Sequence, residues 1–165
     1  MATTLGEFIE HAWNQHVDDL AGVAARLDQG LPLLKREPER TGEFVDLVEH
    51  VLVAHLGDAD TMARWIERLA PLALEHPDAA PPLARARLAV GLLRGAPVDA
   101  SAQPRAVLIR AYGSAANGAS AQGDLARARR LLEAAEAHAE AGDTDSVKAL
   151  AAVANNLASQ LLHGP

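Results

Sequence analysis

Residues 8–19 read FIEHAWNQHVDD and residues 47–58 read LVEHVLVAHLGD, and each stretch contains Glu-His, four further residues and a second His. The two copies lie 39 residues apart, and other positions repeat at the same interval. The residues that are identical at this interval are Glu10/Glu49, His11/His50, His16/His55, Asp19/Asp58, Ala24/Ala63, Pro32/Pro71 and Pro38/Pro77. A repeat of this length is typical of α-solenoids, in which each helix pair buries its apolar face only against its neighbours.

Apolar residues are spaced for helices along the chain, and no segment shows the sustained alternation of a strand. In the opening segment, the apolar positions that recur every three or four residues are Leu5, Phe8, Ile9, Ala12, Trp13, Val17 and Leu20. Short Gly, Asp or Pro turns separate the helical segments, and such connections favour antiparallel neighbours. The sequence therefore predicts an all-α fold, an antiparallel helix-pair α-solenoid of about eight helices in a single domain, 1–165. The expected repeat units cover approximately residues 4–38, 42–77, 80–121 and 123–163.

One segment carries a family resemblance. Residues 111–140 read AYGSAANGASAQGDLARARRLLEAAEAHAE, with an aromatic residue at Tyr112, a small one at Ala116 and a turn at Gly123-Asp124. The packing positions of the second helix would then be Ala128, Leu132 and Ala135. This pattern resembles a tetratricopeptide repeat (TPR). The resemblance implies a right-handed superhelix that binds protein or peptide partners, and it places Asn117 at a position often used for peptide contact.

Charge and composition exclude several classes of function. Nucleic-acid-binding proteins usually carry an excess of basic residues, whereas this chain has a net charge of −7. The chain has no cysteine, so it can form neither a disulfide framework nor a thiolate metal site. No apolar run approaches the roughly 18 residues needed to span a bilayer, and no targeting segment opens the sequence. We expect a cytoplasmic protein that binds neither nucleic acid nor membrane.

The histidine spacing argues against a metal site. In an α-helix, five residues at about 100° each place His16 about 140° around the axis from His11, and the same spacing separates His50 from His55. We therefore expect His16 and His55 to serve packing or hydrogen bonding. The sequence predicts no cofactor, no metal ligand and no stoichiometric zinc, iron or manganese.

Polar residues of the first helices suggest a partner site. The residues predicted to bind a partner are Glu7, His11, Asn14, Glu43, Asp46, His50 and Asn117. In a solenoid, those on the first two units would line one concave acidic groove, with His11 and His50 side by side. Such a groove suits a basic peptide or protein, so the leading hypothesis is a non-catalytic interaction module. The alternatives are a small-ligand or metal-dependent helical enzyme using His11/His50, and an immunity or regulatory subunit that neutralises one partner.

The final predicted helix is unusually apolar. Between residues 146 and 162 the only charged side chain is Lys148. An exposed apolar face of that length exceeds what monomers usually tolerate, and a twofold contact would cover it with a second copy of itself. We therefore expect a homodimer through 146–162.

Overall fold

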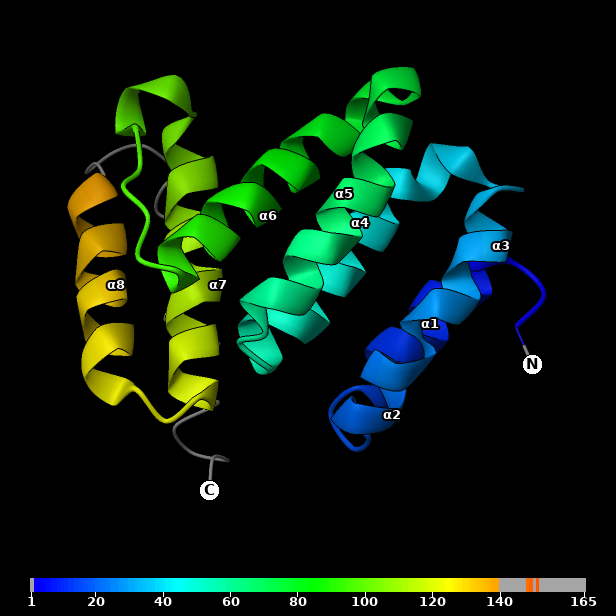
Figure 1. The fold of residues 1–165 in the computed structure, drawn as a ribbon, viewed down its shortest axis with the longest axis horizontal. Coiled ribbons are helices and arrows are strands. Elements are labelled where there is room, and N and C mark those ends of the chain that lie inside the picture. The colour runs from blue at the N-terminus through cyan, green and yellow to red at the C-terminus, as the bar shows by residue number, and fades with distance from the viewer. Residues whose placement is uncertain (1, 140–147, 150, 152–165) are drawn as a thin grey trace.

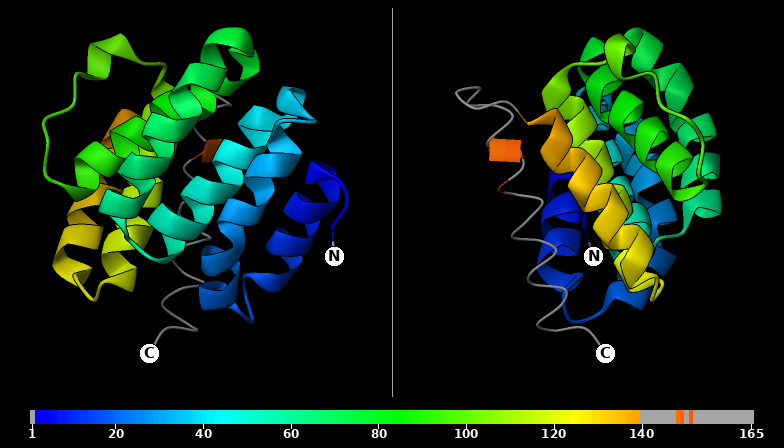
Figure 2. Two further views of the ribbon diagram at one scale, coloured as in Figure 1. Left: turned by 45° about the vertical axis from the view of Figure 1, so that its right-hand side comes forward. Right: turned by 90° about the vertical axis from the view of Figure 1, so that its left-hand side faces the viewer.

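The computed structural model describes residues 2–139, 148, 149 and 151, and every regular element in these residues is helical. The all-α prediction is confirmed there. The α-helices are α1 Leu5–Gln15, α2 Leu20–Arg26, α3 Gly30–Leu34, α4 Thr41–Glu49, α5 Ala59–Glu75, α6 Ala80–Leu93, α7 Arg105–Ala121 and α8 Leu125–His138. A π-helical segment, η3, spans His50–His55 and continues α4, and short 3-10 turns occupy Leu27–Gln29, Pro38–Arg40, Pro77–Ala79 and Ala100–Ala102. The helices follow one another across the molecule from α1 at one end to α8 at the other (Figures 1 and 2).

Acidic residues begin several of the helices. The carboxylates of Asp19, Asp58 and Asp124 each accept a hydrogen bond from a backbone N–H in the first turn of α2, α5 and α8, respectively. Thr4 does the same for α1 through its hydroxyl. Each of these side chains satisfies a donor that the helix itself leaves unpaired, which is why the predicted turns fall where the helices begin.

The second helix of the first unit is interrupted. The sequence predicts one helix from about residue 20 to 35, but the structure breaks it into α2, a 3-10 turn and α3. At the break, a Cβ on Gly30 would lie only 2.6 Å from the Phe44 ring, so the bare backbone lets that ring approach. The corresponding helix of the second unit, α5, runs unbroken through Pro71. The two units therefore repeat in sequence more closely than in backbone shape.

The centre of the core is the continuous rod formed by α4 and η3. Its buried apolar residues are Phe44, Val45, Leu47, Val48, Val51, Leu52, Val53 and Ala54. A helix that is apolar on nearly every side is enclosed by its neighbours, and this rod packs against α1, α2, α5, α6 and α7.

Two glycines bring η3 close to α7. A Cβ on Gly118 would lie 2.4 Å from the backbone oxygen of Val53. Gly57, which follows η3, has a φ of +63°, and a Cβ there would lie 2.4 Å from the backbone oxygen of Gly118. Only glycine fits such an approach at both positions. This contact fixes the position of η3 relative to α7.

Two further sequence predictions concern the apolar C-terminal segment and the absence of a membrane-spanning helix. The apolar segment 146–162, with the homodimer predicted through it, lies outside the described residues apart from Lys148, Ala149 and Ala151. Among the helices that the structure describes, none is both long and apolar enough to cross a bilayer.

Candidate functional site

The π-helical turn of η3 brings two histidines together. The backbone N–H of Leu56 donates to the carbonyl of Val51, five residues earlier, at 3.2 Å. This wider turn returns the fifth residue to nearly the same side of the helix, unlike an α-helical turn. The ring centroids of His50 and His55 lie 4.5 Å apart and their Nε2 atoms 3.0 Å apart. The expectation that this spacing separates the two side chains is wrong for His50 and His55, because it assumed α-helical geometry.

The third histidine of this cluster comes from the end of α1. The Nε2 atom of His16 lies 3.2 Å from Nε2 of His50, and the rings of His16 and His55 have centroids 5.1 Å apart. On its other side, Nδ1 of His16 lies 2.6 Å from the backbone oxygen of Trp13. A carbonyl oxygen only accepts hydrogen bonds, so Nδ1 carries the proton and Nε2 presents its lone pair to the cluster. We call His16, His50 and His55 the histidine cluster.

The histidine cluster is half-buried and covered on one side by an indole ring. The Trp13 ring lies 4.4 Å from the His50 ring, centroid to centroid, and meets the His16 ring edge-on at 5.5 Å. Burial, together with the nearby His55 and His16, lowers the pKa of His50 to about 3. Burial, followed by the effect of His16, also lowers the pKa of His55. Both imidazoles are therefore neutral at physiological pH.

Next to the histidine cluster lies a polar pocket of about 260 Å³. Its lining residues come from α1, α4, η3, α6 and α7 together with Ala149, and include Trp13, Asp46, Glu49, His50, Arg85, Arg110, Ser114 and Asn117. Glu49 and Asn117 are only 4% and 3% exposed, respectively. Among the described residues, neither Oε1 of Glu49 nor Oδ1 of Asn117 has a hydrogen-bond partner. Unpaired buried acceptors are uncommon in folded proteins, so two of them on one pocket point to a missing donor.

Arg85 supplies the main basic group inside the polar pocket. It forms an ion pair with Asp46, and its Nη2 atom lies 3.7 Å from Oε2 of Glu49. Burial raises the pKa of the Glu49 carboxyl, and this effect is opposed by Arg85 and by a hydrogen bond from the Ser114 side chain. The guanidinium is therefore shared between two carboxylates, and the second oxygen of Glu49 is buried beside the pocket without a partner among the described residues.

The structure divides the predicted partner-binding residues between two places. Asp46, His50 and Asn117 line the polar pocket. The α1 residues predicted to join them, which are Glu7, His11 and Asn14, are exposed and line a separate hollow with Glu10. His11 is therefore not part of the wall that holds His50.

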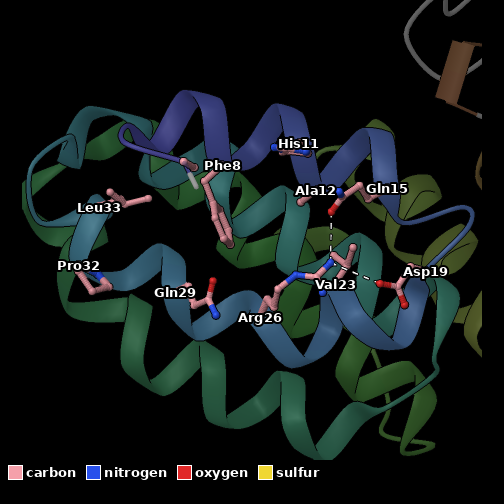
Figure 3. Close-up of a pocket in the computed structure, with 11 residues that line it drawn as sticks. Phe8, His11, Ala12, Gln15, Asp19, Val23, Arg26, Gln29, Pro32 and Leu33 are labelled. Carbon is pink, nitrogen blue, oxygen red and sulfur yellow. Dashed lines mark hydrogen bonds and ion pairs between the residues drawn. The ribbon is translucent and has the colours of Figure 1, made fainter.

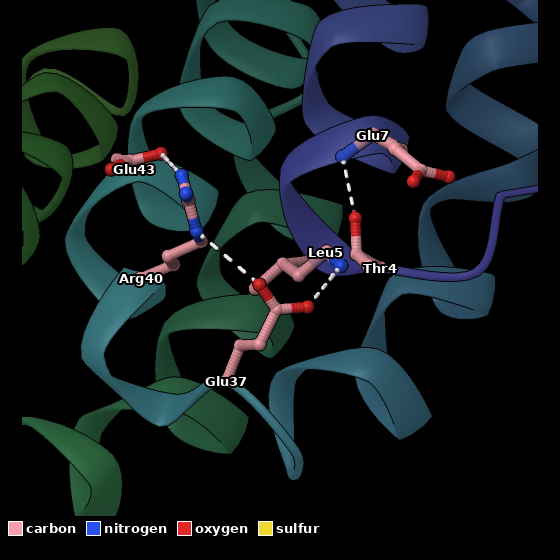
Figure 4. Close-up of polar contacts among 6 residues, drawn as sticks. All are labelled: Thr4, Leu5, Glu7, Glu37, Arg40 and Glu43. Atoms are coloured by element: carbon pink, nitrogen blue, oxygen red, sulfur yellow. Dashed lines mark hydrogen bonds and ion pairs between the residues drawn. The ribbon is translucent and has the colours of Figure 1, made fainter.

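The remaining predicted residue, Glu43, lies in neither hollow. Its carboxylate accepts a hydrogen bond from Arg40 at 2.9 Å (Figure 4). Arg40 also pairs with Glu37, which accepts the backbone N–H of Leu5 at 2.6 Å. Because Arg40 pairs with Glu43 and Arg85 pairs with Asp46, the acidic face expected from the sequence is largely compensated.

Another hollow lies between α1 and the segment from α2 to α3 (Figure 3). It has a volume of about 620 Å³, and His11, Gln15 and Arg26 are among its lining residues. Arg26 donates to Gln15 at 3.2 Å across the hollow and pairs with Asp19 at 3.5 Å. These polar groups satisfy one another, in contrast to Glu49 and Asn117.

Several residues of the site could not be identified from the sequence. Glu49 carries a weak signal, because it belongs to the repeated Glu-His pair, but nothing in its spacing predicts that it is buried. Arg85 and Ser114 lie in helices 36 and 65 residues further along the chain than Glu49 and match no motif. Their role follows only from the packing of α6 and α7 on α4.

Comparison of the chain with protein-family models found no match, and searches of curated proteins and of solved structures found none either.

Proposed function

We propose that this protein is a non-catalytic binding module with a TPR-like α-solenoid arrangement, and that it holds a protein or peptide partner through the polar pocket. The solenoid arrangement is supported by the 39-residue sequence repeat and by the order of the helices, each lying beside the next (Figure 1). Solenoids of this kind present extended surfaces to partners.

The observation that carries the proposal is the pair of unpartnered oxygens on Glu49 and Asn117. N–H groups are the donors that suit such oxygens, and the ammonium of a lysine side chain carries three of them. The volume of about 260 Å³ also favours one side chain of a larger partner. Pockets for free drug-sized ligands are usually larger, about 300–1,000 Å³.

A peptide library tests this proposal. Peptides that bind the wild-type protein should be enriched in lysine, and replacing that lysine by norleucine should abolish their binding. Glu49→Gln and Asn117→Leu should each weaken the selected peptides roughly 10- to 100-fold, since a hydrogen bond to a charged group contributes about 1.5–3 kcal/mol. Glu67→Gln provides the matched control, because Glu67 is exposed on α5, away from the pocket.

Two results would contradict the proposal. One is a library that yields no binder dependent on an N–H donor. The other is a set of binders whose affinity is the same for wild type, Glu49→Gln and Asn117→Leu.

A further inference from the structure

We propose that the histidine cluster is a binding site for a divalent transition-metal ion, and that Zn²⁺ is the ion its donor set suits best. Imidazole nitrogen is a preferred ligand of zinc, and three histidines form a common zinc-binding set. The argument for this site does not use the proposed partner. Of the three ligands only His50 also lines the polar pocket, and His16 and His55 do not.

The separations between the nitrogens fit a single ion. The Nε2 atoms of His50 and His55 lie 3.0 Å apart and those of His16 and His50 lie 3.2 Å apart, and all three potential ligand atoms lie within 4.8 Å of one another. Zinc–nitrogen bonds of about 2.0–2.1 Å in tetrahedral geometry place ligand atoms about 3.3 Å apart. Two of the three nitrogen pairs already lie near this separation, and the third pair lies within 4.8 Å.

Hydrogen bonding alone does not account for the convergence. A ring nitrogen has one position in the ring plane, occupied by either a proton or a lone pair, yet Nε2 of His50 has two nitrogen neighbours. If that nitrogen is unprotonated, it can accept a bond from His55, but it then faces the lone pair of His16. If it is protonated, a single proton must serve both neighbours. A cation at the centre would instead take one lone pair from each of the three rings.

The surroundings of the histidine cluster are those of a metal site. The backbone carbonyl of Trp13 accepts the Nδ1 proton of His16, which fixes the tautomer and orients Nε2 toward the cluster. Metal-binding histidines usually donate their second nitrogen in this way. The pair His50 and His55 converges only because η3 is a π-helical turn, and such turns occur frequently at functional sites.

A site with three protein ligands leaves one coordination position open. Zinc sites of this kind hold water or an added ligand at the fourth position. The three histidines of the cluster are half-buried, so the cluster is partly in contact with solvent.

Metal titration tests the inference. Protein treated with a chelator and then dialysed should bind one equivalent of Zn²⁺ in calorimetry, and Co²⁺ should give the visible absorption bands of a tetrahedral ion. His16→Ala and His55→Ala should each weaken Zn²⁺ binding by at least about 100-fold, because losing only an outer-shell partner already costs about 10- to 100-fold. His11→Ala is the matched control, since His11 is an exposed histidine on the same helix as Trp13. Its effect should stay below twofold.

Circular dichroism of each variant separates loss of the site from loss of the fold. His16 and His55 are the informative positions, because His50 is packed most closely against Trp13 and its neighbours. The inference fails if folded wild-type protein binds no stoichiometric Zn²⁺. It also fails if binding survives in both His16→Ala and His55→Ala, or if His11→Ala weakens it equally.

Discussion

Replacing Gly118 by alanine should destabilise the protein at the contact between α7 and η3. The new Cβ would lie 2.4 Å from the backbone oxygen of Val53, about 1 Å closer than an ordinary contact of about 3.5 Å. Overpacking costs about 1–3 kcal/mol, and the upper end applies here because a backbone atom cannot rotate away. Alanine regains about 1 kcal/mol of helix propensity. The expected net loss is therefore about 2 kcal/mol.

Gly91→Ala provides the matched control. Gly91 lies in α6, and the nearest atom to a Cβ there is 3.7 Å away, which is ordinary contact. The substitution should gain up to about 1 kcal/mol from helix propensity alone. The two variants should therefore differ by about 3 kcal/mol, which corresponds to about 6–12 °C in Tm for a chain of this size. Thermal denaturation followed by circular dichroism measures the difference directly.

The same pair of variants tests the link from this contact to the histidine cluster. If Gly118→Ala pushes η3 away from α7, His50 and His55 move with it, and Zn²⁺ affinity should fall while Gly91→Ala leaves it unchanged. A Tm for Gly118→Ala equal to or above that of Gly91→Ala would refute the close packing of η3 on α7 from which this reasoning starts.

Three further outcomes are expected. Asn117→Leu removes a buried oxygen that has no partner among the described residues, so the free energy of unfolding measured with urea should be unchanged or raised by up to about 1–3 kcal/mol. Peptide binding should be lost in the same variant. A clear loss of stability would mean that the amide stabilises the fold. Asp58→Ala removes the N-terminal cap of α5. The Asp58 carboxylate accepts hydrogen bonds from the backbone N–H and the hydroxyl of Thr61 at 3.1 and 2.6 Å, respectively. Its loss should lower the free energy of unfolding by about 0.5–2 kcal/mol, measured with urea. Zn²⁺ at about 100 times its wild-type Kd should raise the free energy of unfolding of wild type by about 2.7 kcal/mol. The same concentration should raise that of His16→Ala by about 0.4 kcal/mol or less, as judged by calorimetric Tm shifts.

The helices could be predicted from the sequence because their signals are local. Apolar spacing marks α1, and the acidic residues Asp58 and Asp124 mark the starts of α5 and α8. The interruption between α2 and α3 could not be predicted in this way, because Gly30 meets Phe44 from another helix.

The candidate site was less accessible to sequence reasoning. The repeated histidines stand out in the sequence, but the grouping of His16, His50 and His55 depends on a π-helical turn that no local sequence pattern predicts. The expected pairing of His11 with His50 assumed that equivalent positions of two units face the same space. Arg85 and Asn117 reach the polar pocket from helices far along the chain, so tertiary packing alone assembles the unpaired carboxylate and amide oxygens there.

His50 belongs at once to the histidine cluster and to the wall of the polar pocket. An ion that fixes this ring therefore also fixes part of the surface offered to a partner. Whatever factor the ion applies to partner affinity, the partner must apply to ion affinity, because coupling free energies between two binding sites are reciprocal. If both proposed sites are occupied, the metal-loaded and metal-free forms differ in their affinity for the partner, and the supply of the ion then determines how much partner is bound.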